Sequence, residues 1–152
     1  MDILNYLSKS CILIIEDATS RDRVLELLIE AAHNAGKIKD KLRFAEAVAA
    51  RELIVSTAIG QGVAVPHAKV KSLPQFFVVL GILRHGVDWE ALDGIPVRLV
   101  FLIGGPDDNQ KEYLFILSQI VKLVKNIEKR EQLLQCTNPD EALSLVLRQS
   151  NP

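Results

Sequence analysis

The chain has 152 residues, a length that suits one domain around one core, so we expect a single domain over residues 1–152. Its 18 Lys and Arg stand against 19 Asp and Glu, and a formal net charge of −1 gives no general attraction for nucleic acid. No apolar run reaches the roughly 20 residues of a membrane helix and the first residues lack the basic start of a secretory signal, so we expect a cytoplasmic protein without membrane insertion.

The N-terminal part of the chain predicts one strand followed by two amphipathic helices. A β-branched apolar run forms the strand, and capping side chains that end in Ser20 mark the start of the first helix. Gly36 stands where a left-handed residue would end that helix. The second helix repeats the apolar spacing, and we expect Leu53 on its buried side. The predicted bounds are 11–15 for the strand and 21–34 and 41–53 for the helices.

A tight turn and a very short strand follow the second helix. Gly60 and Gly62 can adopt backbone angles closed to other residues, and residues 63–65 then form a buried strand of minimal length. Pro66 lacks an amide donor and holds the preceding residue extended. We therefore expect the sheet to stop at Pro66 and His67 to open a loop, at a position where α/β folds often carry chemistry.

The C-terminal part predicts two interior strands and three helices. The strands are apolar and bounded by Pro and Gly, so His85 is expected in a solvated turn beyond the first of them. The long helix carries an apolar stripe that we expect to face the core, and Asn138 is expected to cap the last helix. Strands that alternate with helices indicate a layered α/β domain with a mixed β-sheet flanked by helices. The predicted strands are 76–83 and 97–103, the helices 107–126, 129–135 and 139–148, and the stripe Leu114, Leu117, Ile120, Val121 and Val124.

Several residues that carry chemistry elsewhere have structural explanations here. Cys11 and Cys136 lack metal-ligand spacing, and we expect two small buried hydrophobic side chains. His33 is expected to stabilise the end of a helix. Ser56 and Thr57 are expected to satisfy turn backbone rather than bind a ligand. A solvated helix surface accounts for the basic cluster Lys122, Lys125, Lys129 and Arg130.

A set of positions around His67 and farther along the chain carries a family resemblance. These positions are Arg51-Glu52, Ser56-Thr57, Ile59-Gly60, Gly62, Ala64, Pro66-His67, Gly86-Val87-Asp88-Trp89, Asp93-Gly94-Ile95-Pro96-Val97 and Pro106. The chain resembles the fructose/mannitol-class (type 2) enzyme IIA domain of the bacterial phosphoenolpyruvate-dependent phosphotransferase system over nearly its whole length. In organisation it is similar to the free-standing nitrogen-regulatory IIA branch. The resemblance implies the fold of that class of domain.

The resemblance implies a phosphotransferase component that works as a carrier through a phosphohistidine at His67. In the family this histidine is phosphorylated by a histidine phosphocarrier protein, either general or nitrogen-branch, and the matching Nε2 atom carries the group. Arg51 matches the active-site arginine, and its planar fork can donate twice to a phosphate. Because transfer between imidazoles needs only positioning and charge stabilisation, we expect neither a metal nor a cofactor.

Tyr113 is a departure from the family pattern. Many members carry a second histidine in a Glu-His-Leu sequence, where this chain has Glu112-Tyr113-Leu114. A tyrosine can donate one hydrogen bond but cannot become cationic, so we expect Tyr113 to line the phosphoryl pocket and expect delivery to a IIB domain to suffer more than acceptance. The expected function is a phosphoryl carrier that regulates a target protein. Two alternatives remain open: the IIA component of a fructose- or mannitol-like uptake system with a separate IIB, and a non-catalytic interaction module.

Overall fold

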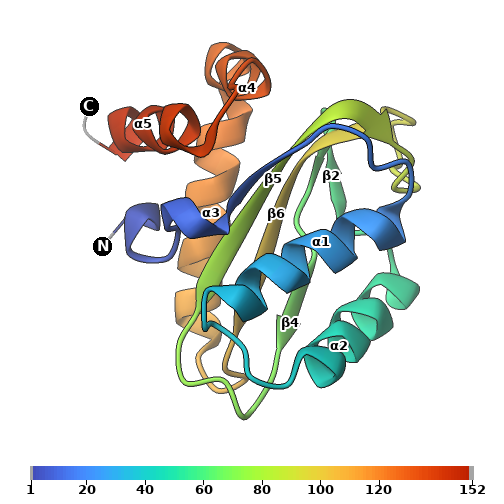
Figure 1. Cartoon of the computed structure of the whole chain (residues 1–152), viewed down its shortest axis with the longest axis vertical. Coiled ribbons are helices and arrows are strands. Elements are labelled where there is room, and N and C mark those ends of the chain that lie inside the picture. Colours follow the sequence, from blue (N-terminus) through green and yellow to red (C-terminus); the bar gives the residue numbers. More distant parts are fainter. Residues whose placement is uncertain (1, 151–152) are drawn as a thin grey trace.

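A six-stranded mixed sheet lies between two helical layers in this computed structural model, which describes residues 2–150 apart from the side chains of residues 149 and 150. Figure 1 shows α1 and α2 on one face of the sheet and α3 on the other, with α4 and α5 at one end. Each face buries its own apolar cluster. The predicted α/β class with a mixed sheet is therefore confirmed.

Two long antiparallel strands form the centre of the sheet. β5 (Phe77–Val87) and β6 (Val97–Gly105) pair in register from Phe77 with Gly104, and β1 (Ile12–Ile15) lies parallel to β5 on the outer side. Along the other side of β6 lie two short strands, β3 (Val63–Ala64) and β4 (His67–Lys69), both parallel to it. β2 (Ala58–Gly60) pairs with β3 and completes this edge.

The helices begin at side-chain caps. Ser20, Asp40 and Asn109 accept a backbone N–H in the first turns of α1 (Arg21–Asn34), α2 (Lys41–Ile54) and α3 (Gln110–Lys125). Gly36 follows α1 with φ +76°, as predicted. The remaining helices are α4 (Ile127–Leu134), α5 (Pro139–Ser150) and the 3₁₀ turns η1 (Ile3–Asn5) and η2 (Lys9–Cys11).

Three predictions about strands and caps need correction. The sheet does not stop at Pro66, because His67 begins β4 and pairs with Ile103 of β6. His85 is not in a turn but within β5, where it is exposed. The long helix begins three residues later than predicted, since Asn109 provides its cap and the preceding aspartates remain outside. Neighbouring strands and caps decide these boundaries, and local composition does not report them.

The predicted core-facing stripes are partly wrong. In α3, Leu114 is 50% exposed and Val121 is 41% exposed, whereas Tyr113, Ile116 and Leu123 are buried. In α2, Leu53 is 85% exposed. Both helices have apolar side chains on more than one face, and the direction in which a helix meets the sheet selects the face that becomes core. Among residues 2–150, no helix is long and apolar enough to cross a membrane.

Candidate functional site

His67 lies at the edge of the sheet where elements from both helical layers meet. A left-handed turn through Gly60, Gln61 and Gly62 brings the chain back into the sheet, and Val63 to Lys69 then follow β6. Val63 and Val65 pack on the α3 side of the sheet and Ala64 and Ala68 on the α1/α2 side. Strand alternation therefore directs the half-buried imidazole of His67 towards α3.

The two ring nitrogens of His67 have different partners, and these define its tautomer. Nδ1 lies 3.1 Å from the backbone oxygen of Val65, an atom that only accepts hydrogen bonds, so Nδ1 carries the proton. Nε2 accepts a hydrogen bond from Nε of Arg51 at 3.2 Å, so Nε2 carries the lone pair. The contacts on both sides of the ring thus agree on one neutral tautomer with a nucleophilic Nε2.

The surroundings of His67 also favour its neutral form. Burial lowers the pKa of the imidazole below its ordinary value, and the cations of Arg51 and Lys69 lower it further. The hydrogen bond to Val65 and the carboxylate of Glu52 act in the opposite direction without reversing the result. A lowered pKa keeps Nε2 unprotonated at neutral pH and somewhat below it.

Arg51, the predicted cation, occupies the last turn of α2. Its guanidinium donates through Nε to His67 and through Nη1 to the backbone oxygen of Val55, at 2.9 Å. These two hydrogen bonds hold the planar fork beside Nε2 of His67. A charged, oriented donor at this point is suited to an anion bound on that nitrogen.

Tyr113 of α3 lies on the other side of the imidazole. The centroids of the two rings are 5.2 Å apart and the planes are inclined by 50°. The phenol ring is buried, with 7% of its surface exposed, and burial raises its pKa, so it remains a neutral hydroxyl. The structure therefore brings together His67, Arg51 and Tyr113, the three residues that the sequence analysis named for the site.

Lys69 is a basic residue of this site that the sequence analysis missed. Its ammonium group lies 4.3 Å from the centroid of the Tyr113 ring and donates to Oε1 of Gln110 at 2.5 Å. Residues two apart on a strand project to the same side, so Lys69 accompanies His67. This spacing was visible in the sequence, but the strand had been predicted to end at Pro66.

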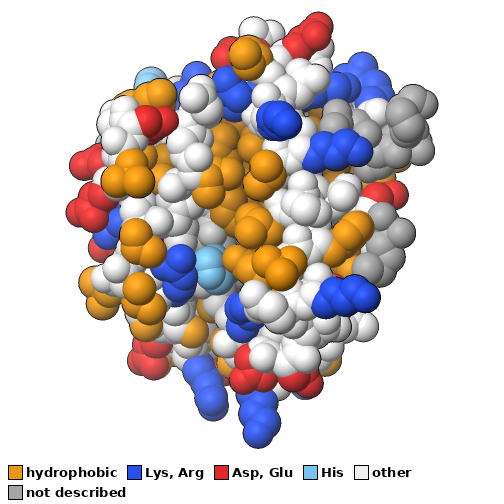
Figure 2. Space-filling view, turned by 180° about the vertical axis from the view of Figure 1, so that it is seen from behind, with side chains coloured by type: hydrophobic (Ala, Val, Ile, Leu, Met, Phe, Trp, Pro, Cys, Tyr) orange, Lys and Arg blue, Asp and Glu red, His pale blue; other side chains and the backbone are white. Residues whose placement is uncertain are grey.

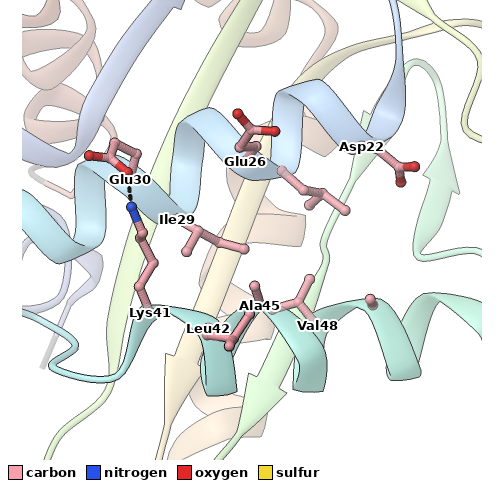
Figure 3. Close-up of a pocket in the computed structure, with 10 residues that line it drawn as sticks. Asp22, Glu26, Ile29, Glu30, Lys41, Leu42, Ala45 and Val48 are labelled. Carbon is pink, nitrogen blue, oxygen red and sulfur yellow. Dashed lines mark hydrogen bonds and ion pairs between the residues drawn. The ribbon is translucent and has the colours of Figure 1, made fainter.

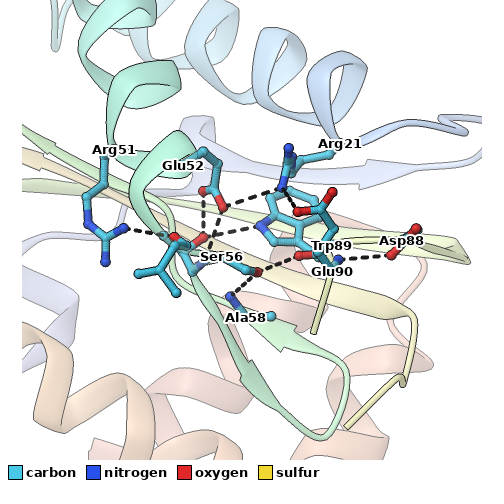
Figure 4. A network of polar contacts seen from close by, with 10 residues as sticks. Arg21, Arg51, Glu52, Ser56, Ala58, Asp88, Trp89 and Glu90 are labelled. Atoms are coloured by element: carbon cyan, nitrogen blue, oxygen red, sulfur yellow. Dashed lines mark hydrogen bonds and ion pairs between the residues drawn. The ribbon is translucent and has the colours of Figure 1, made fainter. Parts of the chain in front are cut away.

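A buried polar network fixes the loop between Arg51 and the turn (Figure 4). The carboxylate of Glu52, 7% exposed, accepts from the backbone N–H of Thr57 at 3.0 Å and from its hydroxyl at 2.6 Å. The indole of Trp89 donates to the same hydroxyl at 3.2 Å, and Ser56 donates to the backbone oxygen of Trp89. Ser56 and Thr57 thus serve the loop, as predicted, and hold Arg51 in place only indirectly.

Replacement of Thr57 by valine is expected to lower the free energy of unfolding by about 1–3 kcal/mol. The substitution keeps the shape but leaves the buried carboxylate of Glu52 and the indole of Trp89 without their hydroxyl partner. Urea unfolding followed by tryptophan fluorescence measures the change. Thr57→Ser, which keeps the hydroxyl, is the matched control, and equal losses in both variants would contradict the role of this hydrogen bond.

A family comparison can now be set beside this geometry. Residues 5–149 match the model of the family described as "Phosphoenolpyruvate-dependent sugar phosphotransferase system, EIIA 2". The chain belongs to this family. The resemblance found in the sequence is therefore confirmed, and the chain is a type 2 IIA domain of the phosphotransferase system.

Named relatives of this IIA domain include both sugar-specific and regulatory proteins. It is 33% identical over 146 residues to the fructose-specific EIIABC component of Bacillus subtilis, covering 96% of this chain but only 23% of that protein. It is 32% identical over 134 residues to a nitrogen regulatory protein of Bradyrhizobium diazoefficiens, covering 88% of this chain and 86% of that protein. Among solved structures, it is similar to nitrogen regulatory protein IIA-Ntr of Neisseria meningitidis, with a TM-score of 0.86, 26% identity, and coverage of 93% of this chain and 97% of that chain.

Proposed function

We propose that His67 accepts a phosphoryl group on Nε2 from a histidine phosphocarrier protein, either general or nitrogen-branch. The observation that carries the proposal is the arrangement of the ring nitrogens, with Nδ1 donating to the Val65 oxygen and Nε2 unprotonated beside Arg51. A neutral imidazole with a fixed nucleophilic nitrogen can attack phosphorus without a general base. The family role of a phosphoryl carrier fits this chemistry.

The transfer exchanges one nitrogen–phosphorus bond for another. The lone pair on Nε2 of His67 attacks the phosphorus of the donor's phosphohistidine, and the bond to the donor's imidazole nitrogen breaks and returns its electron pair to that ring. Nδ1 of His67 keeps its proton and its hydrogen bond to Val65 throughout. As Nε2 donates electron density and gains positive charge, the Val65 oxygen stabilises the ring, much as a carboxylate or carbonyl orients other catalytic histidines.

In this proposal three side chains hold the transferred group. When Nε2 bonds to phosphorus, the Nε–H of Arg51 loses its nitrogen acceptor and lies beside the equatorial phosphoryl oxygens. Lys69 supplies a second positive charge near the ring, and Tyr113 offers a neutral hydroxyl from its buried position. The proposed site is therefore His67 with Arg51, Lys69 and Tyr113 as phosphoryl-stabilising residues.

A regulatory output is the favoured role of the phosphorylated state. Tyr113 replaces the second histidine seen in many members and packs against the acceptor ring, where it cannot become cationic. Phosphorylation adds about two negative charges to a face that is otherwise basic, which is enough to change the proteins that bind there. Delivery to a separate IIB domain, as in a sugar-uptake system, is the second candidate, because a relative that is 31% identical over 140 residues is named the fructose-like EIIA component of Escherichia coli, and the match covers 94% of it.

The test is intact-mass analysis after incubation with phosphoenolpyruvate, enzyme I and each phosphocarrier protein. We expect a gain of one acid-labile phosphoryl group, together with the NMR signature of Nε2 phosphohistidine. A chase with an unphosphorylated IIB domain then separates the two candidates, since rapid loss of the group would favour delivery and retention would favour regulation. No gain from either carrier, with the protein folded, would support the non-catalytic interaction module instead.

A further inference from the structure

A groove runs between α1 and α2, in the helical layer on the other side of the sheet from α3 (Figure 3). Its volume of about 470 Å³ gives room for several side chains of a partner. Nearly buried aliphatic side chains form its base, and small or exposed apolar residues of α2 form one wall. The base consists of Leu25, Ile29 and Val48, and the wall of Leu42, Ala45 and Ala49. We call this feature the α1/α2 groove.

The α2 wall of the groove is apolar although it faces outward. Leu42 is 71% exposed, and Ala45 and Ala49 lie one and two turns farther along the same side of the helix. A single exposed leucine is common in proteins, but this one continues the apolar base of a groove. Two alanines one turn apart also leave space in which the side-chain ridge of a third helix can pack. The wall therefore has the composition and shape of a contact surface.

The charged side chains of the groove are mostly acidic. Asp22, Glu26 and Glu30 stand one turn apart on α1 and span about 12 Å along its axis. Lys41, the single basic residue that lines the groove in the described chain, pairs with Glu30 at 2.5 Å. Glu26 pairs at 2.6 Å with Arg23, which lies outside the lining. Both ion pairs are exposed and weak, so this row of carboxylates attracts a cationic partner and repels an anionic one.

The α3 side of the molecule has a different character. Figure 2 views the molecule from behind, and basic side chains and a histidine lie there among hydrophobic ones. The imidazole of His67 is directed towards α3 and lies beside the basic side chains Arg51 and Lys69. A partner bound in the α1/α2 groove therefore leaves the approach to His67 open, and its binding needs no phosphoryl transfer.

The kind of segment that fits the groove follows from its walls. Both walls are helices, so the groove has no free strand edge to which an extended peptide could add. No aromatic side chain lines it in the described part of the chain, whereas grooves for proline-rich segments are lined by aromatic rings. Its carboxylates repel phosphorylated segments and nucleic acid. An amphipathic helix, which lays a stripe of aliphatic side chains into an apolar groove, is the binding mode that remains.

We propose that the α1/α2 groove binds an amphipathic helix of a second protein, with aliphatic side chains in the groove and lysine or arginine on the flank that faces α1. Basic residues one turn apart on that helix would meet Asp22, Glu26 and Glu30 in succession. The small side chains of Ala45 and Ala49 let the partner helix approach α2 closely. The domain can then hold a target protein on one helical layer while its acceptor histidine stays accessible on the other.

The test uses a synthetic peptide of about 18 residues, long enough to form a helix on contact, with leucine along one stripe and lysine along its flanks. Titration followed by amide NMR should show saturable binding, with the largest shift changes at Ile29, Leu42 and Ala45. Glu26→Lys should weaken binding at least about tenfold at about 50 mM salt, and less at about 500 mM salt. Leu42→Gln should weaken binding at least about threefold at both salt concentrations, because it removes apolar surface from the wall.

Matched changes outside the groove make the test specific. Glu128→Lys makes the same change of charge at an exposed position of α4, and Leu92→Gln removes another exposed leucine. Neither variant should alter the affinity for the peptide. Two control peptides, one of the same composition in scrambled order and one with glutamate in place of lysine, should bind at least about tenfold more weakly than the lysine peptide.

Several results would overturn the proposed binding mode. These are absence of binding by the lysine peptide, equal binding by the scrambled peptide, equal affinity in folded Glu26→Lys, and shift changes that gather on α3 and not in the groove. Sedimentation of the free protein as a dimer that Leu42→Gln dissociates would instead assign the groove to a second copy of this chain. None of these outcomes bears on the labelling of His67, which the phosphocarrier proteins test separately.

Discussion

Replacement of His67 by alanine is expected to abolish phosphorylation by any phosphocarrier protein. The described chain has one imidazole whose Nε2 is unprotonated, half-buried and held by a guanidinium, and the other two histidines, His33 and His85, are exposed. No neighbouring side chain offers a comparable nucleophile, since the hydroxyl of Tyr113 has a raised pKa and stays neutral. Intact-mass analysis under conditions that fully label the wild type would show no added phosphoryl group.

Two further variants test whether the loss of phosphorylation is specific to the imidazole of His67. His67→Gln keeps a side chain of similar reach that can donate and accept hydrogen bonds, so the turn and Arg51 should remain in place while the nucleophile is gone. His85→Ala removes an exposed histidine of β5 and should leave labelling complete. Residual acid-labile phosphate on His67→Gln, or loss of labelling in folded His85→Ala, would show that the acceptor lies elsewhere.

Arg51→Gln is expected to slow phosphoryl acceptance by about 100-fold, the typical effect of removing one donor that stabilises charge in a transition state. The variant loses the charged hydrogen bond to Nε2 of His67 and the hydrogen bond to the Val55 oxygen. Because Arg51 is only partly buried, the variant should still fold. Rapid-quench kinetics with a phosphorylated carrier measure the loss. Arg51→Lys should restore only part of the rate, because an ammonium lacks the planar fork.

Arg51→Gln is also expected to change the pH dependence of phosphoryl acceptance. Arg51 is among the groups that lower the pKa of His67, so its removal should raise that pKa. A protonated imidazole has no free lone pair on Nε2, so phosphoryl acceptance is lost as the pH falls through the pKa of His67 in the folded protein. The variant should therefore lose activity at a higher pH than the wild type. NMR titration of the His67 ring checks this, and a downward shift of the midpoint would contradict the assigned role of Arg51.

Much of the fold followed from local sequence patterns, and the centre of the site followed from a family resemblance. The helices at 21–34 and 41–53, the long strands and the mixed α/β class came from apolar periodicity, and caps such as Ser20 and Gly36 marked the ends correctly. The positions of His67, Arg51 and Tyr113 came from a family resemblance that the family match confirms as a whole. Their roles in transfer remain proposals for the experiments above.

Only the tertiary structure decided which groups lie side by side. The tautomer of His67 depends on Val65 and Arg51 lying on opposite sides of one ring, and Lys69 joined the site because pairing with β6 extends the strand beyond Pro66. Sequence periodicity shows that α3 is apolar on more than one face but not which of them meets the sheet. The exposure of Leu114 and the placement of Lys122 beside it depend on that choice, because the packing direction of a helix is a property of the whole domain.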